Sequence, residues 1–345
     1  MAKIVYGISG QGFGHGARSR EIIRHLQRQG HTVLALTYHQ GVPFVDGLTE
    51  YLEIPGLVLS YRNNRLVYSK TILLNLKQLA KQTAQWHPIN EQVAAFAPDV
   101  VITDFEPISA LIAHRQRLPL ISIDNQHQLT NTKLNVPLKY QQHLMTDKLV
   151  TKAVVWGAKA YLIPTFFKTP TTKKDTYLFP PVIRQEVLDL PSAIGHTLIA
   201  YQGAHFDNVI RILKKLDQTC VIYGADKEYT DGKLTFKKAA TSEWLQALAS
   251  AKAVIGTAGS SLICEALHLK KPYLALPIQG QIEQVLNALE LERLGYGMMS
   301  ERLTLGQLQQ FIDRLPEYRK HLESYESVQP NPLLAKLDQL IAGYA

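Results

Sequence analysis

Residues 254–277 decide the fold class, and they read VIGTAGSSLICEALHLKKPYLALP. A short apolar run ends in the small residues Gly256 to Gly259, and two serines then open a stretch with helical periodicity. A second apolar run follows Pro272. Apolar strands separated by a helix are typical of a parallel sheet, so this stretch predicts two strands of one parallel sheet and the helix that joins them.

The same alternation extends outward from this stretch in both directions along the chain. Its apolar runs are rich in Val, Ile and Leu, which favours a sheet that is covered on both faces. Strands are expected at residues 3–9, 31–38, 99–103, 118–123, 159–163, 197–201, 219–223, 253–256 and 273–276. Helices are expected at residues 17–29, 208–216, 242–250, 261–269 and 281–294, with further helical stretches in the N-terminal half.

One interruption of this alternation divides the chain. Prolines, Thr-Lys clusters and the pair Pro180-Pro181 are typical of a linker, which we place at residues 166–190. We therefore expect an α/β protein with two Rossmann-like, doubly wound domains, residues 1–165 and 191–345, that face each other across a cleft. The last helix is assigned to the second domain, and packing back on the first domain is the alternative. Small molecules bind preferentially in such clefts.

Composition and charge exclude several classes of protein. The 345 residues are 46% hydrophobic and 19% charged, which is typical of a globular chain and not of a disordered or fibrous one. The apolar runs are too short to span a bilayer, and the N-terminus enters a strand without a secretory signal, so a cytoplasmic protein is expected. Cys220 and Cys264 lie in apolar runs and are expected to be core residues.

The net charge of +8 is unevenly distributed. Residues 1–180 contain 20 Lys and Arg against 11 Asp and Glu, whereas residues 181–345 contain 17 against 18. This difference suggests that the N-terminal half meets an anionic partner. Residues 61–82 combine five basic residues with leucines, so they could rest on the anionic inner face of a membrane or form an ordinary amphipathic helix. No module that combines aromatic and basic residues points to nucleic acid.

A glycine-rich loop with a histidine follows the first predicted strand. Gly12 and Gly14 lie just before His15, where backbone amides could approach an acceptor or an anion. The spacing resembles a dinucleotide fingerprint, but the second predicted strand does not end in the carboxylate that such a site needs. We expect His15 to act as a general base, Asp104 to be the reserve base, and Arg18 to hold an anionic group.

The loop within residues 254–277 could hold a diphosphate at the start of a helix. Thr257, Gly259, Ser260 and Ser261 could offer amides and hydroxyls to it. Glu265 lies about one turn further on, where it could reach the hydroxyl groups of a ribose. Glu283 and Gln284, at the start of the next predicted helix, could bind sugar hydroxyl groups.

These motifs resemble the nucleotide-sugar-dependent glycosyltransferases of the GT-B fold, above all the group related to the UDP-GlcNAc transferase that forms lipid II. The resemblance rests on Gly259, Ser260, Ser261, Glu265, Pro272, Gln284, Asn287 and Ala288, and on the loop that contains Gly10, Gly12, Gly14 and His15. It implies that Glu265 binds the ribose, that Gln284 and Asn287 belong to the donor site, and that Gln202 and Gly203 help to close over the diphosphate. It implies no cofactor and no obligatory metal.

The resemblance also has departures that leave the substrates open. Gln11 and Phe13 replace small residues of the glycine loop, and the pair Glu283-Gln284 stands where the lipid II enzymes have two glutamines. We expect an inverting glycosyltransferase of the hexosyltransferase type that uses a nucleoside-diphosphate sugar, preferably UDP-linked, and a hydroxyl acceptor. A lipid-linked or cell-envelope glycan precursor is one candidate acceptor. The alternatives are a UDP-sugar 2-epimerase on the same fold and a non-catalytic protein that binds nucleotide sugars.

Overall fold

The chain forms two compact units, which are described separately. The computed structural model describes residues 1–344, except residues 57–59, 63–64, 67, 202–205 and 239–240. Unit 1 comprises Met1–Ser60, Val67–Val182 and Val328–Ala345. Unit 2 comprises Tyr61–Leu66 and Ile183–Ser327.

Unit 1 is built on a seven-stranded sheet with the strand order β3-β2-β1-β6-β7-β8-β9. Every neighbouring pair in this sheet is parallel. The strands are β1 (Lys3–Ile8), β2 (Thr32–Thr37), β3 (Glu50–Glu53), β6 (Val100–Asp104), β7 (Leu120–Ile123), β8 (Ala160–Pro164) and β9 (Thr176–Phe179). The chain winds outward in opposite directions from β1 and β6, so the carboxyl ends of these two strands form the switch point at which α/β sheets bind ligands.

Helices cover both faces of this sheet, as their buried residues show. They are α1 (Phe13–Arg28), α2 (Val42–Val45), α3 (Tyr68–Phe96), α4 (Pro107–Gln116), α5 (Gln128–Asn131), α6 (Gln141–Val154) and α14 (Pro332–Ala342), with short 3-10 turns at His39–Gly41 and Leu138–Tyr140. A two-stranded ribbon, β4 (Tyr61–Arg62) and β5 (Arg65–Leu66), precedes α3 in the chain.

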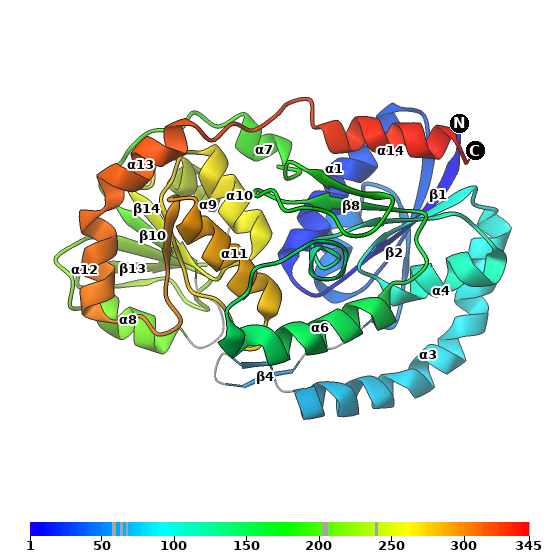
Figure 1. Ribbon diagram of the computed structural model, residues 1–345, viewed down its shortest axis with the longest axis horizontal. Helices are drawn as coiled ribbons and strands as arrows, with labels where there is room; N and C mark the ends of the chain where they lie inside the picture. The colour runs from blue at the N-terminus through cyan, green and yellow to red at the C-terminus, as the bar shows by residue number, and fades with distance from the viewer. Residues whose placement is uncertain (57–59, 63–64, 67, 202–205, 239–240, 345) are drawn as a thin grey trace. The chain divides into compact units, whose positions relative to one another are not determined.

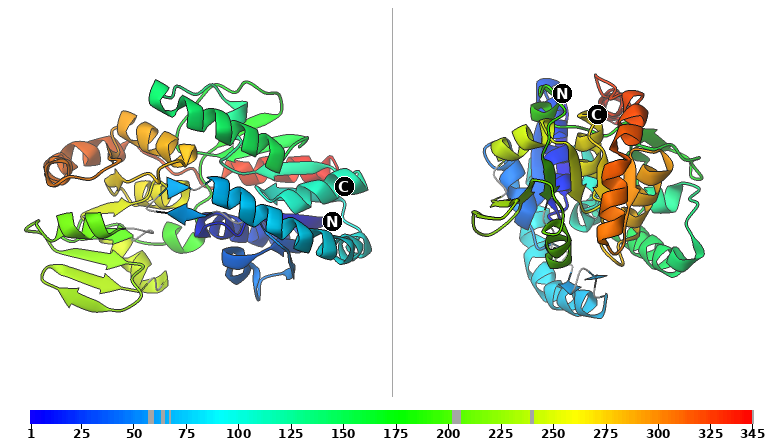
Figure 2. Two further views of the ribbon diagram at one scale, coloured as in Figure 1. Left: turned by 90° about the horizontal axis from the view of Figure 1, so that it is seen from below. Right: turned by 90° about the vertical axis from the view of Figure 1, so that its left-hand side faces the viewer.

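The C-terminal helix α14 completes the core of unit 1. Leu333, Leu337 and Ile341 are buried in the same cluster as β1 and α1. At the start of α14, the Asn331 side chain donates hydrogen bonds to the carbonyl oxygens of Pro180 and Pro181, at 3.2 and 2.8 Å. The returning chain is thereby attached to the segment by which the chain leaves unit 1. Both termini lie at the same end of this unit (Figure 1, and the left view of Figure 2).

Unit 2 repeats the architecture with the strand order β12-β13-β11-β10-β14-β15-β16. Its strands are β10 (Leu198–Tyr201), β11 (Cys220–Tyr223), β12 (Tyr229–Asp231), β13 (Leu234–Lys237), β14 (Ala253–Gly256), β15 (Tyr273–Ala275) and β16 (Gly297–Met299). Only β12 of these runs antiparallel to its neighbour, and β11 to β13 lie at one edge (yellow-green in Figure 2). The helices are α7 (Gln185–Leu188), α8 (Asp207–Leu213), α9 (Thr241–Ala249), α10 (Ser260–His268), α11 (Ile282–Arg293), α12 (Leu305–Asp313) and α13 (Leu315–Glu323).

The structure differs from the sequence prediction in three places that bear on the site. Helix α1 begins at Phe13 instead of residue 17, so Gly14 and His15 lie in its first turn and not in a loop. The expected linker, residues 166–190, contains β9 and α7, and the crossing between the units falls between Val182 and Ile183. The C-terminal residues 328–345, expected in the second domain, belong to unit 1, which was the alternative.

Candidate functional site

The first candidate site lies at the switch point of unit 1. Helix α1 follows β1 closely and carries His15 in its first turn, and Asp104 is the last residue of β6, the strand beside β1. The two side chains meet, with His15 Nδ1 2.6 Å from Asp104 Oδ1. The fold therefore brings together residues that are 89 positions apart in the chain.

The contact with Asp104 determines which nitrogen of His15 can accept a proton. A carboxylate only accepts hydrogen bonds, so Nδ1 carries the proton and Nε2 of the neutral ring has a free lone pair. The His15 side chain is 15% exposed, and none of the described residues makes a hydrogen bond to its Nε2. A ring that is held at one nitrogen and open at the other has the geometry of a general base.

Asp104 itself is fully buried and accepts hydrogen bonds from three side chains. Arg18 approaches it with Nε at 3.0 Å and Nη2 at 2.6 Å, and Ser19 Oγ donates at 3.1 Å, in addition to the contact from His15. Burial alone would raise the pKa of Asp104, but the charge of Arg18 and the contact with His15 outweigh burial and hold the pKa below its usual value.

These contacts argue against two of the expected roles in unit 1. A carboxylate has about four lone-pair positions, and those of Asp104 are occupied, so Asp104 cannot serve as the reserve base for an acceptor hydroxyl. The guanidinium of Arg18 is buried and binds Asp104 and the Asn125 side chain, so an acceptor anion would have to compete with both. Both residues are placed to orient His15 instead.

The glycines around His15 are needed chiefly for packing. A Cβ atom would lie 2.0 Å from Ser109 Oγ at Gly7, 1.9 Å from the Tyr38 carbonyl oxygen at Gly10, and 2.2 Å from a Phe44 ring carbon at Gly16. Gly12 differs, because a Cβ atom there would meet nothing within 4 Å. The φ angle of Gly12 is 91°, in the region that favours glycine, and its N–H donates to Gln40 Oε1 at 2.8 Å.

Two further carboxylates at strand ends of unit 1 have structural partners. Glu106 caps helix α4 by accepting hydrogen bonds from the backbone N–H groups of Ile108 and Ser109, at 2.8 and 2.6 Å. Burial raises the pKa of Glu106 to about 7. Asp124 accepts a hydrogen bond from Ser122 Oγ at 2.6 Å and pairs with His127 Nδ1 at 2.7 Å. Because His127 also contacts the Val155 carbonyl oxygen through Nε2, at 3.3 Å, neither nitrogen of this imidazole is open.

The second candidate site is the loop between β14 and α10 in unit 2. The N-cap residue of α10 is Gly259, which has no side chain to cap the helix, and a Cβ atom at this position would meet nothing within 4 Å. The first amides of the helix, at Ser260 and Ser261, therefore lie at the positive end of the helix dipole beside open space. The hydroxyl of Tyr273 donates to the Thr257 carbonyl oxygen at 2.7 Å and fixes the start of the loop.

The polar side chains at the start of α11 hold this loop. Gln284 Oε1 accepts hydrogen bonds from the backbone N–H groups of Ala258 and Ile278, at 3.2 and 3.1 Å, and its amide nitrogen donates to Gln281 Oε1 at 2.6 Å. Asn287 is buried and donates to the Ala258 carbonyl oxygen at 3.0 Å. In this structure both residues shape the loop, whereas Glu283 lies partly exposed in the first turn of α11.

Glu265, on α10, forms a bidentate ion pair with Arg184. Arg184 Nε lies 2.7 Å from Glu265 Oε1 and Nη2 lies 2.8 Å from Oε2. Arg184 was not predicted as a site residue, because it lies in the range expected to be a linker. Tyr273 was predicted only as part of a strand. Gln202 and Gly203, which were expected to help close over the diphosphate, lie outside the described residues.

The solved structures that are similar over the whole chain are GT-B glycosyltransferases, so the predicted fold class is confirmed. Residues 2–316 match the model of glycosyl transferase family 1, and the chain belongs to that family.

Three of the similar proteins show how far the likeness extends. An uncharacterized glycosyltransferase of Methanosarcina acetivorans is 25% identical in an alignment 332 residues long that covers 86% of this chain and 85% of the relative. A UDP-N-acetylglucosamine–N-acetylmuramyl-(pentapeptide) pyrophosphoryl-undecaprenol N-acetylglucosamine transferase of Clostridium novyi is 34% identical in an alignment 103 residues long that covers only 28% of this chain and 29% of the relative. The structure of a UDP-glucosyltransferase from Polygonum tinctorium, capable of glucosylating indoxyl and 3,4-dichloroaniline, has a TM-score of 0.70 at 12% identity and covers 99% of this chain and 98% of that one.

The comparisons confirm that the protein is a glycosyltransferase of the GT-B type. They give no support to the alternative of a UDP-sugar 2-epimerase. Within the part of the chain that the structure describes, no helix combines the length and the apolar character needed to cross a membrane.

Proposed function

We propose that the protein transfers a sugar from a UDP-linked donor to a hydroxyl group of an acceptor, with inversion, and that His15 is the base. The pairing of His15 with Asp104 carries this proposal, because it leaves His15 Nε2 as an open proton acceptor at the switch point of unit 1. Nε2 takes the proton of the acceptor hydroxyl group, while the oxygen of that group bonds to the anomeric carbon of the donor sugar. The bond from that carbon to the diphosphate breaks, and the electron pair leaves with the diphosphate.

Unit 2 supplies the proposed donor site. The N-terminus of α10 stabilises the negative charge that grows on the departing diphosphate, because its first amides lie at the positive end of the helix dipole and its N-cap residue is a glycine. Glu265 binds the hydroxyl groups of the ribose. A UDP-linked donor is supported by the Clostridium novyi and Polygonum tinctorium proteins, both of which are named for a UDP-linked sugar.

A histidine variant tests the proposed base. His15→Ala should lower the rate of UDP release from UDP-sugars, in the presence of an undecaprenyl-pyrophosphate-linked acceptor, by about 10²- to 10⁴-fold, since a positioned base is lost. The affinity for UDP should not change, because the proposed donor site lies in unit 2. His25→Ala is a matched control, since His25 lies on the same helix and also pairs with a carboxylate, that of Asp338 at 2.9 Å. A rate for His15→Ala within about threefold of the wild-type rate would remove His15 as the base.

We also propose that the acceptor is lipid-linked and that unit 1 contacts an anionic membrane surface. The acceptor named for the Clostridium novyi relative is linked to undecaprenol, which supports this choice. In residues 61–82, the region that the sequence suggests for membrane contact, the structure describes few side chains, of which Lys70 and Leu73 are exposed. A second amphipathic segment of unit 1, around α6, carries the stronger evidence.

Helix α6 exposes an apolar stripe. Met145 and Leu149 lie four residues apart on one face of the helix and are 60% and 68% exposed. Two more exposed apolar residues lie next to the helix in the chain: Leu138 in the 3-10 turn before α6, and Trp156 two residues after its end. Lysines occur in the helix at positions 148 and 152, and next to it in the chain at positions 139 and 159. An apolar face with lysines near it in the chain suits an anionic lipid surface, because the lysines would repel a second copy of the same stripe.

Vesicle flotation tests this contact. The wild-type protein should float with vesicles that contain phosphatidylglycerol at low salt, and less so at high salt, since screening weakens the contribution of the lysines. The double variant Met145→Glu/Leu149→Glu should remain at the bottom of the gradient. Ile194→Glu, at a position that is 67% exposed in unit 2, is the matched control and should float. Flotation of the α6 variant at the wild-type level would contradict the contact.

A further inference from the structure

The ion pair between Arg184 and Glu265 joins two rigidly held side chains. Glu265 lies in the middle of α10, between the buried residues Cys264 and Ala266, so the packing of the helix fixes its direction. Arg184 precedes the short helix α7, and its carbonyl oxygen accepts hydrogen bonds from the backbone N–H groups of Val187 and Leu188, at 3.0 and 3.2 Å. Val187 is fully buried and anchors α7. Both side chains of the pair therefore extend from backbone segments that are held by packing or hydrogen bonds.

The geometry of the pair leaves part of the carboxylate available to a ligand. The guanidinium engages both oxygens of Glu265 side by side, at 2.7 and 2.8 Å. A carboxylate has about four lone-pair positions, so a bidentate arginine leaves about two of them to accept hydrogen bonds from hydroxyl groups. The Glu265 side chain is 8% exposed, so this small surface is the part that a ribose can reach.

The charges of the pair favour an arginine that stays in place when a nucleotide binds. Removing Arg184 from Glu265 would leave an almost buried carboxylate without its compensating charge, which is costly. Two ribose hydroxyl groups are neutral donors and would replace the guanidinium poorly.

We infer that Arg184 is a positioning residue of the donor site: it holds the Glu265 carboxylate in the orientation in which its remaining lone pairs accept hydrogen bonds from the ribose. This inference rests on the proposed role of Glu265. Arg184 acts through Glu265, so its effect is specific to nucleotides whose ribose hydroxyl groups Glu265 can bind. Loss of Arg184 therefore changes the recognition of the ribose, and not merely the overall affinity for the nucleotide.

Calorimetry with two nucleotides separates this role from a purely structural one. The wild-type protein should bind 2′-deoxy-UDP about 10- to 100-fold more weakly than UDP, because one hydrogen bond to a charged acceptor is lost. We call the dissociation constant for 2′-deoxy-UDP divided by that for UDP the ribose ratio. Arg184→Met should reduce this ratio to within about threefold of unity. Arg184→Lys should give an intermediate ratio, since one ammonium group cannot engage both oxygens. Arg184→Lys keeps the positive charge, so it supplies the test if Arg184→Met does not fold.

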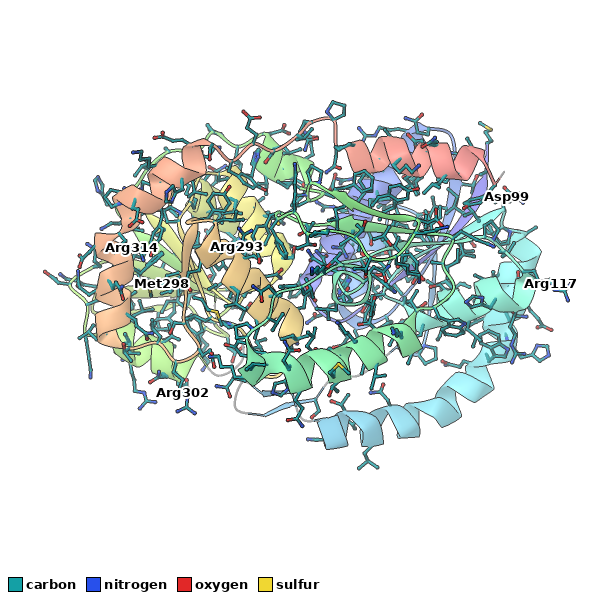
Figure 3. All side chains as sticks on the ribbon, in the orientation of Figure 1. Asp99, Arg117, Arg293, Met298, Arg302 and Arg314 are labelled. Carbon is teal, nitrogen blue, oxygen red and sulfur yellow. The ribbon has the colours of Figure 1, made fainter. Side chains whose placement is uncertain are left out.

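Two further variants complete the experiment. Arg314 forms a bidentate pair with Glu317, at 2.9 and 3.0 Å, on the exposed surface near the start of α13, where Figure 3 labels it. Arg314→Met removes an arginine that makes the same kind of pair with Glu317 and not with Glu265, so it should leave the ratio unchanged. Glu265→Gln should lower the ratio, and adding Arg184→Met to Glu265→Gln should lower it no further, because both changes act on the same contact.

The outcomes distinguish this inference from the proposed function. If Glu265→Gln lowers the ratio but Arg184→Lys and Arg184→Met leave it unchanged, the inference is wrong and the donor site stands. A tighter binding of UDP to Arg184→Met would also overturn the inference, since Arg184 would then compete with the nucleotide. A wild-type protein that does not discriminate between the two nucleotides, or that binds neither, contradicts both the proposed role of Glu265 and the inference.

Discussion

Buried carboxyl groups in unit 1 respond in opposite directions to their surroundings. Hydrogen bonds and the charge of His127 overcome the effect of burial at Asp124 and hold its pKa at about 2, whereas at Glu106 burial prevails and raises the pKa to about 7. The difference follows from their partners. Asp124 faces an imidazole, and Glu106 faces only neutral backbone amides and a hydroxyl.

The raised pKa of Glu106 predicts a particular dependence of stability on pH. Between its ordinary pKa of 4.5 and about 7, the folded protein binds this proton while the unfolded chain releases it. The contribution of Glu106 is therefore fully present below pH 4.5 and is lost as the pH rises through 7, by up to about 3 kcal/mol. Glu106→Gln should remove this decline, measured as the free energy of urea unfolding at pH 5 and pH 7.5.

A matched variant isolates the effect of Glu106 from the other titrating groups. Glu91 is exposed on α3, so Glu91→Gln should change the difference in unfolding free energy between the two pH values very little. If Glu106→Gln leaves that difference equal to the wild-type value, the Glu106 carboxyl group titrates normally and its burial does not control its protonation.

The helix α14 shows how one element can complete a core that is distant in sequence. Leu333, Leu337 and Ile341 lie on one face, four residues apart, and are buried against the cluster that includes Ile4 and Ile22. Asp338, on the same helix, contacts His25 of α1 at 2.9 Å. The helix thus contributes both apolar burial and a polar contact to unit 1.

Truncation of one of these leucines should destabilise unit 1. Leu337→Ala should lower its unfolding free energy by about 2–5 kcal/mol, since Leu337 is fully buried and a cavity remains. Hydrogen exchange at β1 and β2 should report the loss, while amides of β10 and β14 in unit 2 should keep their protection. Gln339→Ala, at an exposed position on the same helix, serves as the control. Equal loss of protection in both units would show that they unfold as one.

At this scale the sequence predicts apolar elements better than polar ones. The strands β1, β6, β10 and β14 were expected from continuous apolar runs, and each is buried on both faces. The edge strands β3 (EYLE) and β12 (YTD) were missed. A strand at the edge of a sheet can form without a continuous apolar run, and neither of these strands has one. The start of α1 was missed because Gly14 and Gly16 in its first turn disfavour a helix, whereas close packing against Phe44 requires glycine at position 16.

For the candidate sites, the sequence identifies positions but not partners. His15 and Asp104 were recognised individually as residues at strand ends, and only the parallel pairing of β1 with β6 brings them into contact. The pairing of Arg184 with Glu265 joins residues 81 positions apart, and no periodicity connects them. Long-range contacts of this kind depend on topology, which local patterns do not contain.

For the whole molecule, the division into units predicts how fragments behave. Residues 183–327 form nearly all of unit 2, including the loop at α10 and the pair of Arg184 with Glu265. This fragment should fold and bind UDP with an affinity within about threefold of that of the full chain, as measured by calorimetry. The fragment 1–182 should not reach the native stability of unit 1, because it lacks α14. Loss of UDP binding by the first fragment would show that the donor site needs unit 1.

The return of α14 to unit 1 also sets an order of events during synthesis. A ribosome produces residues 1–182 first, but the residues that close their core are produced only after all of unit 2. While the chain emerges, unit 2 can reach its native state before unit 1, although unit 1 contains the N-terminus. The surface of β1 and α1 that α14 later covers is exposed throughout this interval, so the nascent chain carries its greatest risk of aggregation there.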